Sequence, residues 1–304
     1  MTTEVSHALC TGFATTPDGL RLYWRAVGSG PTIVCCNGVG VSLFFWKYLV
    51  EHYADRYTVL LWDYRGHGRS DWPPSIEGAD LSIDRHAQDL AVVLDAAGVE
   101  KALLVGHSMG CQVIYEAYRR FPERVVGLVP MLGTAGRTLE TFFDYSGSPK
   151  YFRMIANFLD RVGDAAHYVV RPALQSPLAW VVTRNFKLVD PYYAKRDDML
   201  AYLRHLSGLD LRMFIHSVLM CNEHDAWELL PQIRVPVLVI AGENDAFTPG
   251  WLSRKIAAMI PNSDYLMLAD ASHAALIEQP ETILHRMDRF LKERAVFQEN
   301  LSAA

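Results

Sequence analysis

Residues 101–121 constrain the fold of this chain most strongly, because a strand pattern, a tight turn and a helix pattern follow one another there without a gap. The turn is the pentapeptide GHSMG at 106–110. Gly106 and Gly110 leave room for a sharp change of direction, so Ser108 can adopt a strained conformation with its hydroxyl exposed above a sheet. This unit predicts a nucleophile on the turn; the plainer alternative is a structural connection that contains a serine.

Short apolar segments alternate with helical patterns on both sides of this turn. Segments at 13–15 and 20–27, separated by a Pro-Asp-Gly turn, predict antiparallel strands that open a sheet. The later segments are continuously apolar, which is typical of parallel strands buried on both faces. They predict strands at 32–36, 57–62, 101–105, 124–131, 235–241 and 265–268, and helices at 44–53, 83–97, 112–121 and 281–296. The alternation predicts an α/β fold with a mostly parallel central sheet flanked by helices.

Residues 134–230 interrupt this alternation. They contain no convincing short strand, whereas amphipathic helical stretches recur between prolines. The predicted helices lie at 150–162, 164–170, 177–186, 197–206 and 211–220. A helical block inserted between two strands indicates a lid over the carboxyl ends of the sheet, where α/β proteins bind ligands. We expect a core of residues 1–133 and 231–304, a helical cap over 134–230 and a frayed tail at 299–304.

The predicted cap is rich in aromatic and Met residues. Most of them should pack helix on helix, while the remainder could line an apolar cavity that faces Ser108. We assign Phe142, Phe152 and Phe214 to this substrate-binding cavity, together with Gly38 of the core. The other aromatic and Met residues of this group are Phe143, Tyr145, Met154, Phe158, Trp180, Phe186 and Met213.

The strand at 32–36 runs directly into a glycine-rich loop, NGVG at 37–40. Glycines let a backbone approach a ligand closely, so the N–H groups of this loop are candidate donors to a developing oxyanion. The N–H of Met109, at the first turn of the helix after Ser108, is a second candidate donor. The simpler interpretation is that the loop is only a flexible connection after the strand.

A serine hydroxyl is a poor nucleophile, so it needs a base within hydrogen-bonding reach and a group that orients the base. Polar loops with suitable residues follow the two late strands: GENDAFTP at 242–249 and DASH at 270–273. The chain has 11 histidines, and His273 comes directly after the last predicted strand. These loops should therefore meet the serine turn at the carboxyl edge of the sheet.

Four segments resemble those of the α/β-hydrolase superfamily: the turn at 106–110, the loops at 63–70 and 242–249, and residues 273–280. The resemblance covers the whole chain outside the predicted cap. It implies the order nucleophile, acid and base along the chain. Residue by residue, it implies Ser108 as nucleophile, His273 as base, Asp245 as orienting acid, and the N–H groups of Val39 and Met109 as the oxyanion hole.

Two positions depart from the pattern of this superfamily. The glycine-rich loop usually begins His-Gly and here begins with Asn37, which is similar to intracellular polyhydroxyalkanoate depolymerases and some acyltransferases. The backbone N–H groups of the loop should still be able to donate to an oxyanion after that change. The residue before the base is commonly glycine and here is Ser272. If Asp245 is not the orienting acid, Glu243 is the first alternative. A serine at 108 argues against epoxide hydrolases and haloalkane dehalogenases, which use an aspartate there.

The expected function is that of a serine hydrolase without cofactor or metal, which cleaves a carboxylic ester with an apolar acyl or alcohol part through an acyl-enzyme. The same groups would support hydrolysis of a C–C bond in a diketone-type substrate, polyhydroxyalkanoate depolymerisation, thioester cleavage or acyl transfer. A receptor that traps a small molecule beneath the cap is the alternative from another class.

Composition and the N-terminal sequence limit the classes of partner and the cellular location that we expect. The 304 residues carry a net charge of −5 with both signs interspersed, which disfavours nucleic acid. The N-terminus lacks signal-peptide features and no apolar stretch could span a bilayer, so we expect a cytoplasmic protein without stable membrane insertion; the oligomeric state is left open. The cysteines are Cys10, Cys35, Cys36, Cys111 and Cys221. We expect reduced packing residues, with Cys35 and Cys36 on opposite faces of a strand and Cys111 partly exposed.

Overall fold

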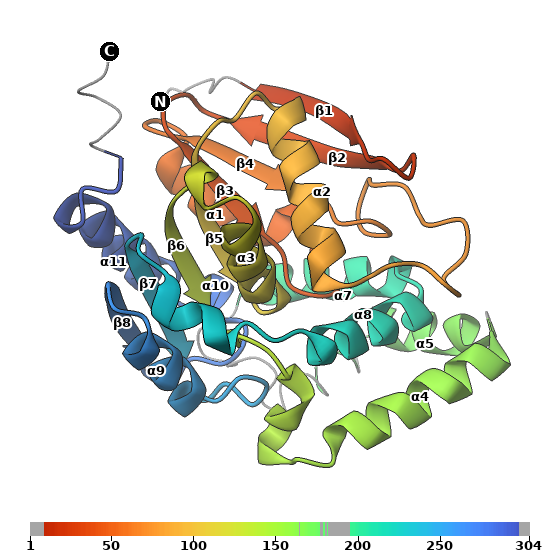
Figure 1. Ribbon diagram of the computed structural model, residues 1–304. Helices are drawn as coiled ribbons and strands as arrows, with labels where there is room; N and C mark the ends of the chain where they lie inside the picture. The colour runs from red at the N-terminus through yellow and green to blue at the C-terminus, as the bar shows by residue number, and fades with distance from the viewer. Residues whose placement is uncertain (1–8, 164, 177–178, 180, 182–194, 298–304) are drawn as a thin grey trace.

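The computed structural model describes residues 9–163, 165–176, 179, 181 and 195–297. Its centre is an eight-stranded sheet with the order β1-β2-β4-β3-β5-β6-β7-β8 (Figure 1). The strands are β1 (Leu9–Thr15), β2 (Arg21–Val27), β3 (Thr32–Cys36), β4 (Thr58–Trp62), β5 (Ala102–His107), β6 (Val125–Met131), β7 (Val237–Gly242) and β8 (Ser263–Leu268). The β1/β2 and β2/β4 pairs are antiparallel, and the later pairs are parallel. The predicted mostly parallel sheet with an antiparallel opening is confirmed.

The sheet separates two hydrophobic layers, because successive side chains of a strand point to opposite faces. In β3, Val34 and Cys36 belong to one layer, whereas Ile33 and Cys35 belong to the other, as predicted for the two cysteines. Helices α2 (Ile83–Ala96), α3 (Met109–Arg120) and α9 (Gly250–Met259) cover the first face, and α1 (Lys47–Tyr53), α10 (Ala275–Glu278) and α11 (Pro280–Glu293) cover the second (Figure 1).

Short 3-10 helices form several of the connections. The helix predicted at 44–53 divides into η1 (Leu43–Trp46) and α1, since Trp46 at the junction has φ −92° and ψ 9°, outside the α-helical region. The other 3-10 helices are η2 (Pro122–Arg124), η3 (Thr138–Glu140), η4 (Phe142–Asp144) and η5 (Trp227–Gln232).

Four helices of the 134–230 segment lie together on one side of the sheet, at the bottom of Figure 1: α4 (Ser148–Val162), α5 (Ala165–Gln175), α7 (Arg196–Gly208) and α8 (Leu211–Glu223). Met213 and Phe214 of α8 lie against Gly66 and Gly40, in the loops that follow β4 and β3. Helix α5 continues through Pro172, where the sequence predicts a break, so the proline removes one hydrogen bond without ending the helix. The helix predicted at 177–186 and the tail at 299–304 lie outside the described residues, apart from residues 179 and 181.

The aromatic side chains of this segment do not all pack between helices. Phe143, Tyr145, Met154 and Phe158 are each more than half exposed, which corrects the prediction for these four. Tyr151 and Ile155 of α4 are also exposed, so α4 presents an apolar stripe to solvent. Phe142, Phe152 and Phe214 are half-buried, Met213 is fully buried, and Trp180 and Phe186 lie outside the described residues.

The prediction that Cys111 is partly exposed is wrong. Cys111 is the third residue of α3 and points beneath the serine turn, where its thiol donates to the carbonyl oxygens of Gly106 and Met131 at 3.3 Å. Burial raises the pKa of this thiol. Cys10 on β1 is exposed, so the prediction that it is a packing residue is wrong as well.

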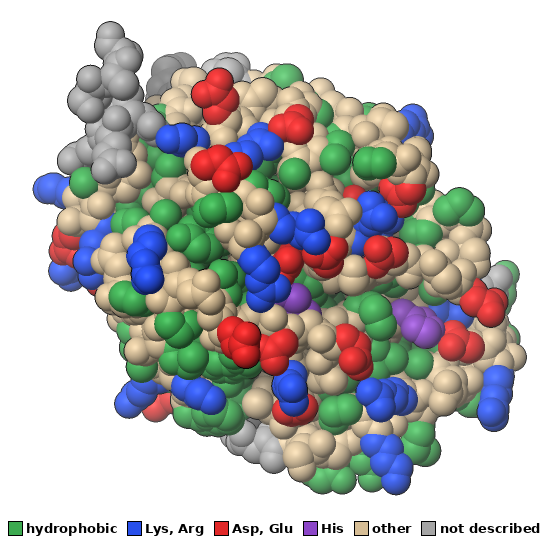
Figure 2. Space-filling view, in the orientation of Figure 1, with side chains coloured by type: hydrophobic (Ala, Val, Ile, Leu, Met, Phe, Trp, Pro, Cys, Tyr) green, Lys and Arg blue, Asp and Glu red, His purple; other side chains and the backbone are tan. Residues whose placement is uncertain are grey.

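Charged side chains of both signs are interspersed over the face of the molecule drawn in Figure 2. Arg65 and Asp89 form an internal ion pair: both are buried and lie 2.7 Å apart, which ties the 63–70 loop to α2. No helix in the described part of the chain is long and apolar enough to cross a membrane.

Candidate active site

Ser108 lies at the sharp turn between β5 and α3. Its φ of 55° and ψ of −117° fall where residues other than glycine are rarely found, so the turn holds backbone strain. The glycines permit this turn, because a Cβ on Gly110 would lie 2.7 Å from the carbonyl carbon of Cys36. A Cβ on Gly106 would lie 2.5 Å from the carbonyl carbon of Gly110. The backbones of β3, β5 and α3 are therefore in direct contact beneath the serine.

The structure brings Ser108, His273 and Asp245 into one hydrogen-bonded chain. His273 Nδ1 lies 2.9 and 3.0 Å from the two carboxylate oxygens of Asp245. Because a carboxylate only accepts, Nδ1 carries the proton, and Nε2 accepts from the Ser108 hydroxyl at 2.9 Å. Glu243, the alternative acid, is exposed and accepts a hydrogen bond from the Asp270 N–H instead.

The carboxylate of Asp245 is sealed from solvent and fully hydrogen-bonded. One oxygen accepts from the N–H groups of Phe247 and Thr248 at 2.9 and 3.0 Å, and the other accepts from the Thr248 hydroxyl at 2.7 Å. Burial raises the pKa of this carboxyl, but the charge and hydrogen bonds of His273, together with Thr248, bring it below the usual value. Asp245 therefore stays ionised and fixes one orientation of the imidazole.

The loop that carries His273 is fixed at two points. His107 on β5 donates from Nε2 to the carbonyl oxygen of His273 at 3.0 Å. Ser272 donates to the buried carboxylate of Glu278 from its N–H at 2.9 Å and from its hydroxyl at 2.6 Å. A glycine could make only the first of these two bonds, so the departure at position 272 adds a hydrogen bond beside the histidine.

The 37–40 loop is held from both sides and is not merely a flexible strand exit. The Asn37 amide donates to the carbonyl oxygen of Trp62 at 2.8 Å and accepts from the Trp46 indole at 2.7 Å. Gly40 donates its N–H to Nε2 of the buried His67 at 3.3 Å. Asn37 thus replaces the usual histidine with a residue that joins β3, β4 and η1.

The two predicted oxyanion donors have no acceptor in the described part of the chain. Neither the N–H of Val39 nor that of Met109 makes a hydrogen bond there. Met109 is the first residue of α3, where backbone N–H groups lack intrahelical partners. Both residues line the same cavity as Ser108, so both N–H groups are available to an oxygen of a ligand.

Two cavities meet at Ser108, with volumes of about 130 and about 170 Å³. The residues common to both are Val39, Ser108, Tyr202, Phe247 and His273. The smaller cavity is otherwise lined by Gly38, Val41, Phe45, His107, Met199, Ala274 and Ile277, and the larger by Met109, Thr138, Phe142, Phe152, Phe214, Val218 and Cys221. The structure thus places all four predicted substrate-binding residues around Ser108, with Gly38 on one side and the three phenylalanines on the other.

A family model described as the alpha/beta hydrolase fold matches residues 31–280. The chain belongs to this family. The hydrolase is 30% identical over 263 residues to "Putative carbamate hydrolase RutD" of Azorhizobium caulinodans, an alignment that covers 86% of this chain and 91% of the relative.

Solved structures agree with this fold. A thermophilic esterase from Thermogutta terrifontis, with malate bound, is 25% identical with a TM-score of 0.72, over 93% of this chain and 98% of the esterase. The enol-lactonase from Burkholderia xenovorans LB400 is 23% identical with a TM-score of 0.74, over 92% and 100% of the two chains. The second likeness concerns the fold alone.

Sequence reasoning missed two residues at the centre of the hydrolase site. Tyr202 lies within a helix of the 134–230 segment, and nothing in its spacing separates it from packing residues. Phe247 lies two positions after Asp245, and its ring centroid is 4.9 Å from that of His273. Proximity to the acid in the 242–249 loop is the one signal that could have identified Phe247.

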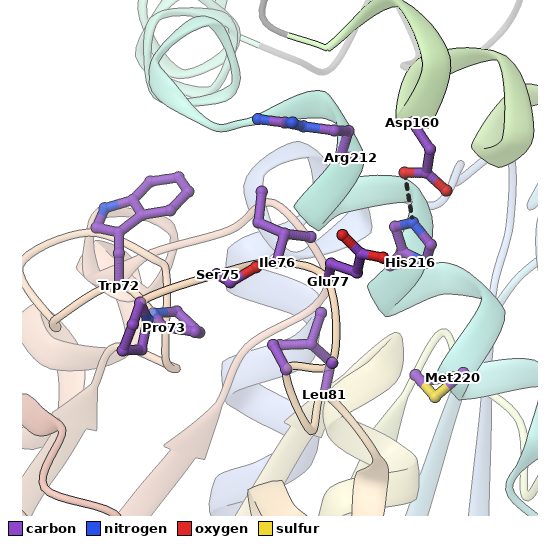
Figure 3. A pocket seen from close by; sticks show the side chains of 13 residues that line it. Trp72, Pro73, Ser75, Ile76, Glu77, Leu81, Asp160, Arg212, His216 and Met220 are labelled. Atoms are coloured by element: carbon purple, nitrogen blue, oxygen red, sulfur yellow. Dashed lines mark hydrogen bonds and ion pairs between the residues drawn. The ribbon is translucent and has the colours of Figure 1, made fainter.

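A further cavity of about 640 Å³ lies between residues 72–81 and helices α4 and α8 (Figure 3). His216 and Asp160 pair at 3.0 Å on one side of it, and the Ser108, Asp245 and His273 side chains do not line it (Figure 3). The described residues also contain no group of three or more His, Cys, Asp or Glu side chains that could hold a metal ion.

Proposed function

We propose that the hydrolase cleaves carboxylic esters with an apolar acyl or alcohol part through an acyl-enzyme on Ser108. One observation carries this proposal: the hydrogen-bonded chain from Ser108 to Asp245 lies where two largely apolar cavities meet. An ester has one branch on each side of its reacting carbonyl. The two cavities offer one compartment for each branch.

The first step is attack of the Ser108 oxygen on the ester carbonyl carbon. His273 Nε2 accepts the serine proton as the new C–O bond forms, and Asp245 stabilises the resulting imidazolium through Nδ1. The tetrahedral intermediate then collapses, the bond to the alcohol oxygen breaks, and His273 returns the proton to the departing alcohol. Water repeats the sequence on the acyl-enzyme and releases the acid.

The negative charge of the tetrahedral oxygen is stabilised by the N–H groups of Val39 and Met109. Removal of one such donor typically costs a factor of about 10² to 10³ in rate. The Asn37 hydrogen bonds and the contact between Gly40 and His67 hold the first donor in place before the substrate arrives. This preorganisation supports a reaction that passes through an oxyanion.

Carbamate cleavage is a second candidate, because a relative with 30% identity is named as a carbamate hydrolase. The largely apolar cavity walls favour an ester, since a carbamate N–H buried there without an acceptor is costly. p-Nitrophenyl pentanoate and p-nitrophenyl N-propylcarbamate have the same length and compare the two directly. Faster turnover of the carbamate would reverse the order of the candidates.

A fluorophosphonate probe tests the acyl-enzyme mechanism. We expect wild-type protein to be labelled at Ser108 and Ser108→Ala to remain unlabelled. Ser75→Ala changes an exposed serine away from the site and serves as the matched control. Folded wild-type protein that resists the probe would contradict the mechanism, and labelled protein that turns over no ester would favour the receptor alternative.

A series of straight-chain p-nitrophenyl esters tests where specificity resides. Each methylene buried should raise kcat/KM about fourfold, from ~0.8 kcal/mol per CH₂, until the cavity is full. Phe152→Ala enlarges the larger cavity, so the best chain length should increase. Phe158→Ala on the same helix removes a 60% exposed ring and should leave it unchanged. Equal behaviour of the two variants would contradict the cap proposed for residues 134–230.

A further inference from the structure

Tyr202 of α7 occupies the wall at the point where the two cavities join. It is one of the five residues that line both, together with Ser108 and His273. Its ring also packs against the hydrophobic layer on the α1 and α11 face of the sheet. The side chain is therefore placed beside the reacting groups and not at the far end of either cavity.

The Tyr202 hydroxyl has no hydrogen-bond partner among the described residues. Several other half-buried or buried tyrosines do have one, for example Tyr64, which donates to the carbonyl oxygen of Asn37 at 2.9 Å. The Tyr115 hydroxyl is sealed within the protein without a partner, and the Tyr202 hydroxyl does not belong to that sealed group. The free O–H of Tyr202 is therefore accessible, and the residue that carries it lines both cavities.

Burial raises the pKa of Tyr202 to about 12, so the phenol is neutral over the working range of a histidine base. A neutral phenol is both a donor and an acceptor, but the donor is the group that a buried ligand oxygen can satisfy. A substrate with only carbon at this position would displace water and leave the O–H unpaired, which is costly in an apolar cavity.

We infer that the Tyr202 hydroxyl donates a hydrogen bond to a second oxygen of the substrate, one or two carbons from the scissile carbonyl on the acyl side. This inference rests on the proposed function and narrows its substrates to esters of alkoxy, keto or hydroxy acids. The scissile carbonyl itself is assigned to the N–H groups of Val39, in the loop after β3, and of Met109, at the first turn of α3. Tyr202 comes from α7 of the 134–230 segment and lines the same cavity, so we assign its hydroxyl to a different oxygen of the substrate.

A matched pair of esters tests the inference. p-Nitrophenyl methoxyacetate and p-nitrophenyl butyrate have acyl chains of equal length, and an ether oxygen replaces one methylene. The ratio of their kcat/KM values is measured for wild type and for Tyr202→Phe. Dividing one ratio by the other cancels the different intrinsic reactivities of the two esters. We expect the preference for the methoxyacetate to fall about tenfold in Tyr202→Phe, within the range for a donor left unpaired.

Tyr168→Phe is the matched control, because it removes the same hydroxyl from a side chain that is 78% exposed on α5. Its ratio should equal that of wild type. A purely structural role of Tyr202 would slow both esters equally, and so would a bond to the scissile carbonyl. An unchanged ratio in Tyr202→Phe therefore overturns the inference.

Fluorophosphonate labelling separates this result from failure of the proposed function. If wild-type Ser108 is not labelled, the acyl-enzyme mechanism fails before Tyr202 is considered. If Ser108 is labelled in both wild type and Tyr202→Phe, the variant site is folded, and the ratio alone decides the role of Tyr202. If Tyr202→Phe is unlabelled, Tyr202→Met, which retains an apolar side chain of similar length, repeats the comparison with the same expectation.

Discussion

Gly110→Ala tests how closely the nucleophile turn and the oxyanion loop are coupled. A Cβ at this position would lie 2.7 Å from the carbonyl carbon of Cys36, at the end of β3, and closer still to the carbonyl oxygen. Carbon atoms rest in contact at about 3.5 Å, so the two backbones must separate by roughly 0.8 Å. Neither backbone can rotate away as a flexible side chain would. The distance between Ser108 and the 37–40 loop should therefore increase by a similar amount.

A displacement of about 1 Å at a catalytic group costs on the order of 10² in rate, which sets the expected loss of kcat/KM for Gly110→Ala. Overpacking also costs about 1–3 kcal/mol, and each kcal/mol lowers the Tm of a chain of this size by roughly 2–4 °C. We expect a folded protein with a Tm a few degrees lower and activity reduced about a hundredfold. Hydrolysis of p-nitrophenyl butyrate and a thermal melt measure both quantities.

Gly208→Ala is the control, since a Cβ there meets no atom within 4 Å at the end of α7. It should keep full activity and an unchanged or slightly higher Tm. The reasoning is refuted if Gly110→Ala retains activity within threefold of wild type. It is also refuted if the losses of Tm and of activity are the same for the two variants.

Three further predictions concern the site and its support. Ser108→Ala and His273→Ala should each abolish most turnover, and the double variant should be little worse, because the groups act as a unit; steady-state kinetics showing additive losses would contradict the assignment. Asp245→Asn should lower kcat by about 10⁴ through the wrong imidazole tautomer, and near-wild-type kcat would place the acid elsewhere. Burial lowers the pKa of His86 to about 3, and both its ring nitrogens are sealed without partners. The unfolded chain therefore binds this proton first, and stability is complete above pH ~6.5 and is lost as pH falls toward 3. Urea unfolding of His86→Leu should show a slope between pH 4 and 6 that is smaller by ~1.4 kcal/mol per pH unit, and an unchanged slope would refute this origin.

The sequence predicts those parts of the hydrolase that local patterns determine. Strands β3 and β5 are continuously apolar because both faces are buried, so their positions and the glycine-rich turns after them could be read directly. Ser108 directly follows β5, and His273 follows β8, whose apolar segment could also be recognised. Polar residues at the carboxyl ends of parallel strands converge at one edge of a sheet, so the two are expected to meet. The structure brings them to 2.9 Å across a separation of 165 residues.

Other features depend on contacts between distant segments and leave no local pattern. Cys111 is buried where its thiol can donate to the carbonyl oxygens of Gly106 and Met131. Helix periodicity alone does not predict these contacts. The same holds for Tyr202, because its place between two cavities is fixed by packing of α7 over the sheet. The exposed ring of Phe158 has the spacing of a core residue and could not be distinguished from one.

The strand that leads to the base lies at a weaker place in the sheet than the strand that leads to the nucleophile. β5 lies between β3 and β6 and is buried throughout, whereas β8 forms the edge, pairs with β7, and has five half-buried residues out of six. Edge elements with fewer buried contacts open locally at a lower free energy than the global transition. Amide hydrogens of β8 should therefore exchange faster than those of β5, and gentle heating should detach His273 and inactivate the protein reversibly while the central strands are still folded.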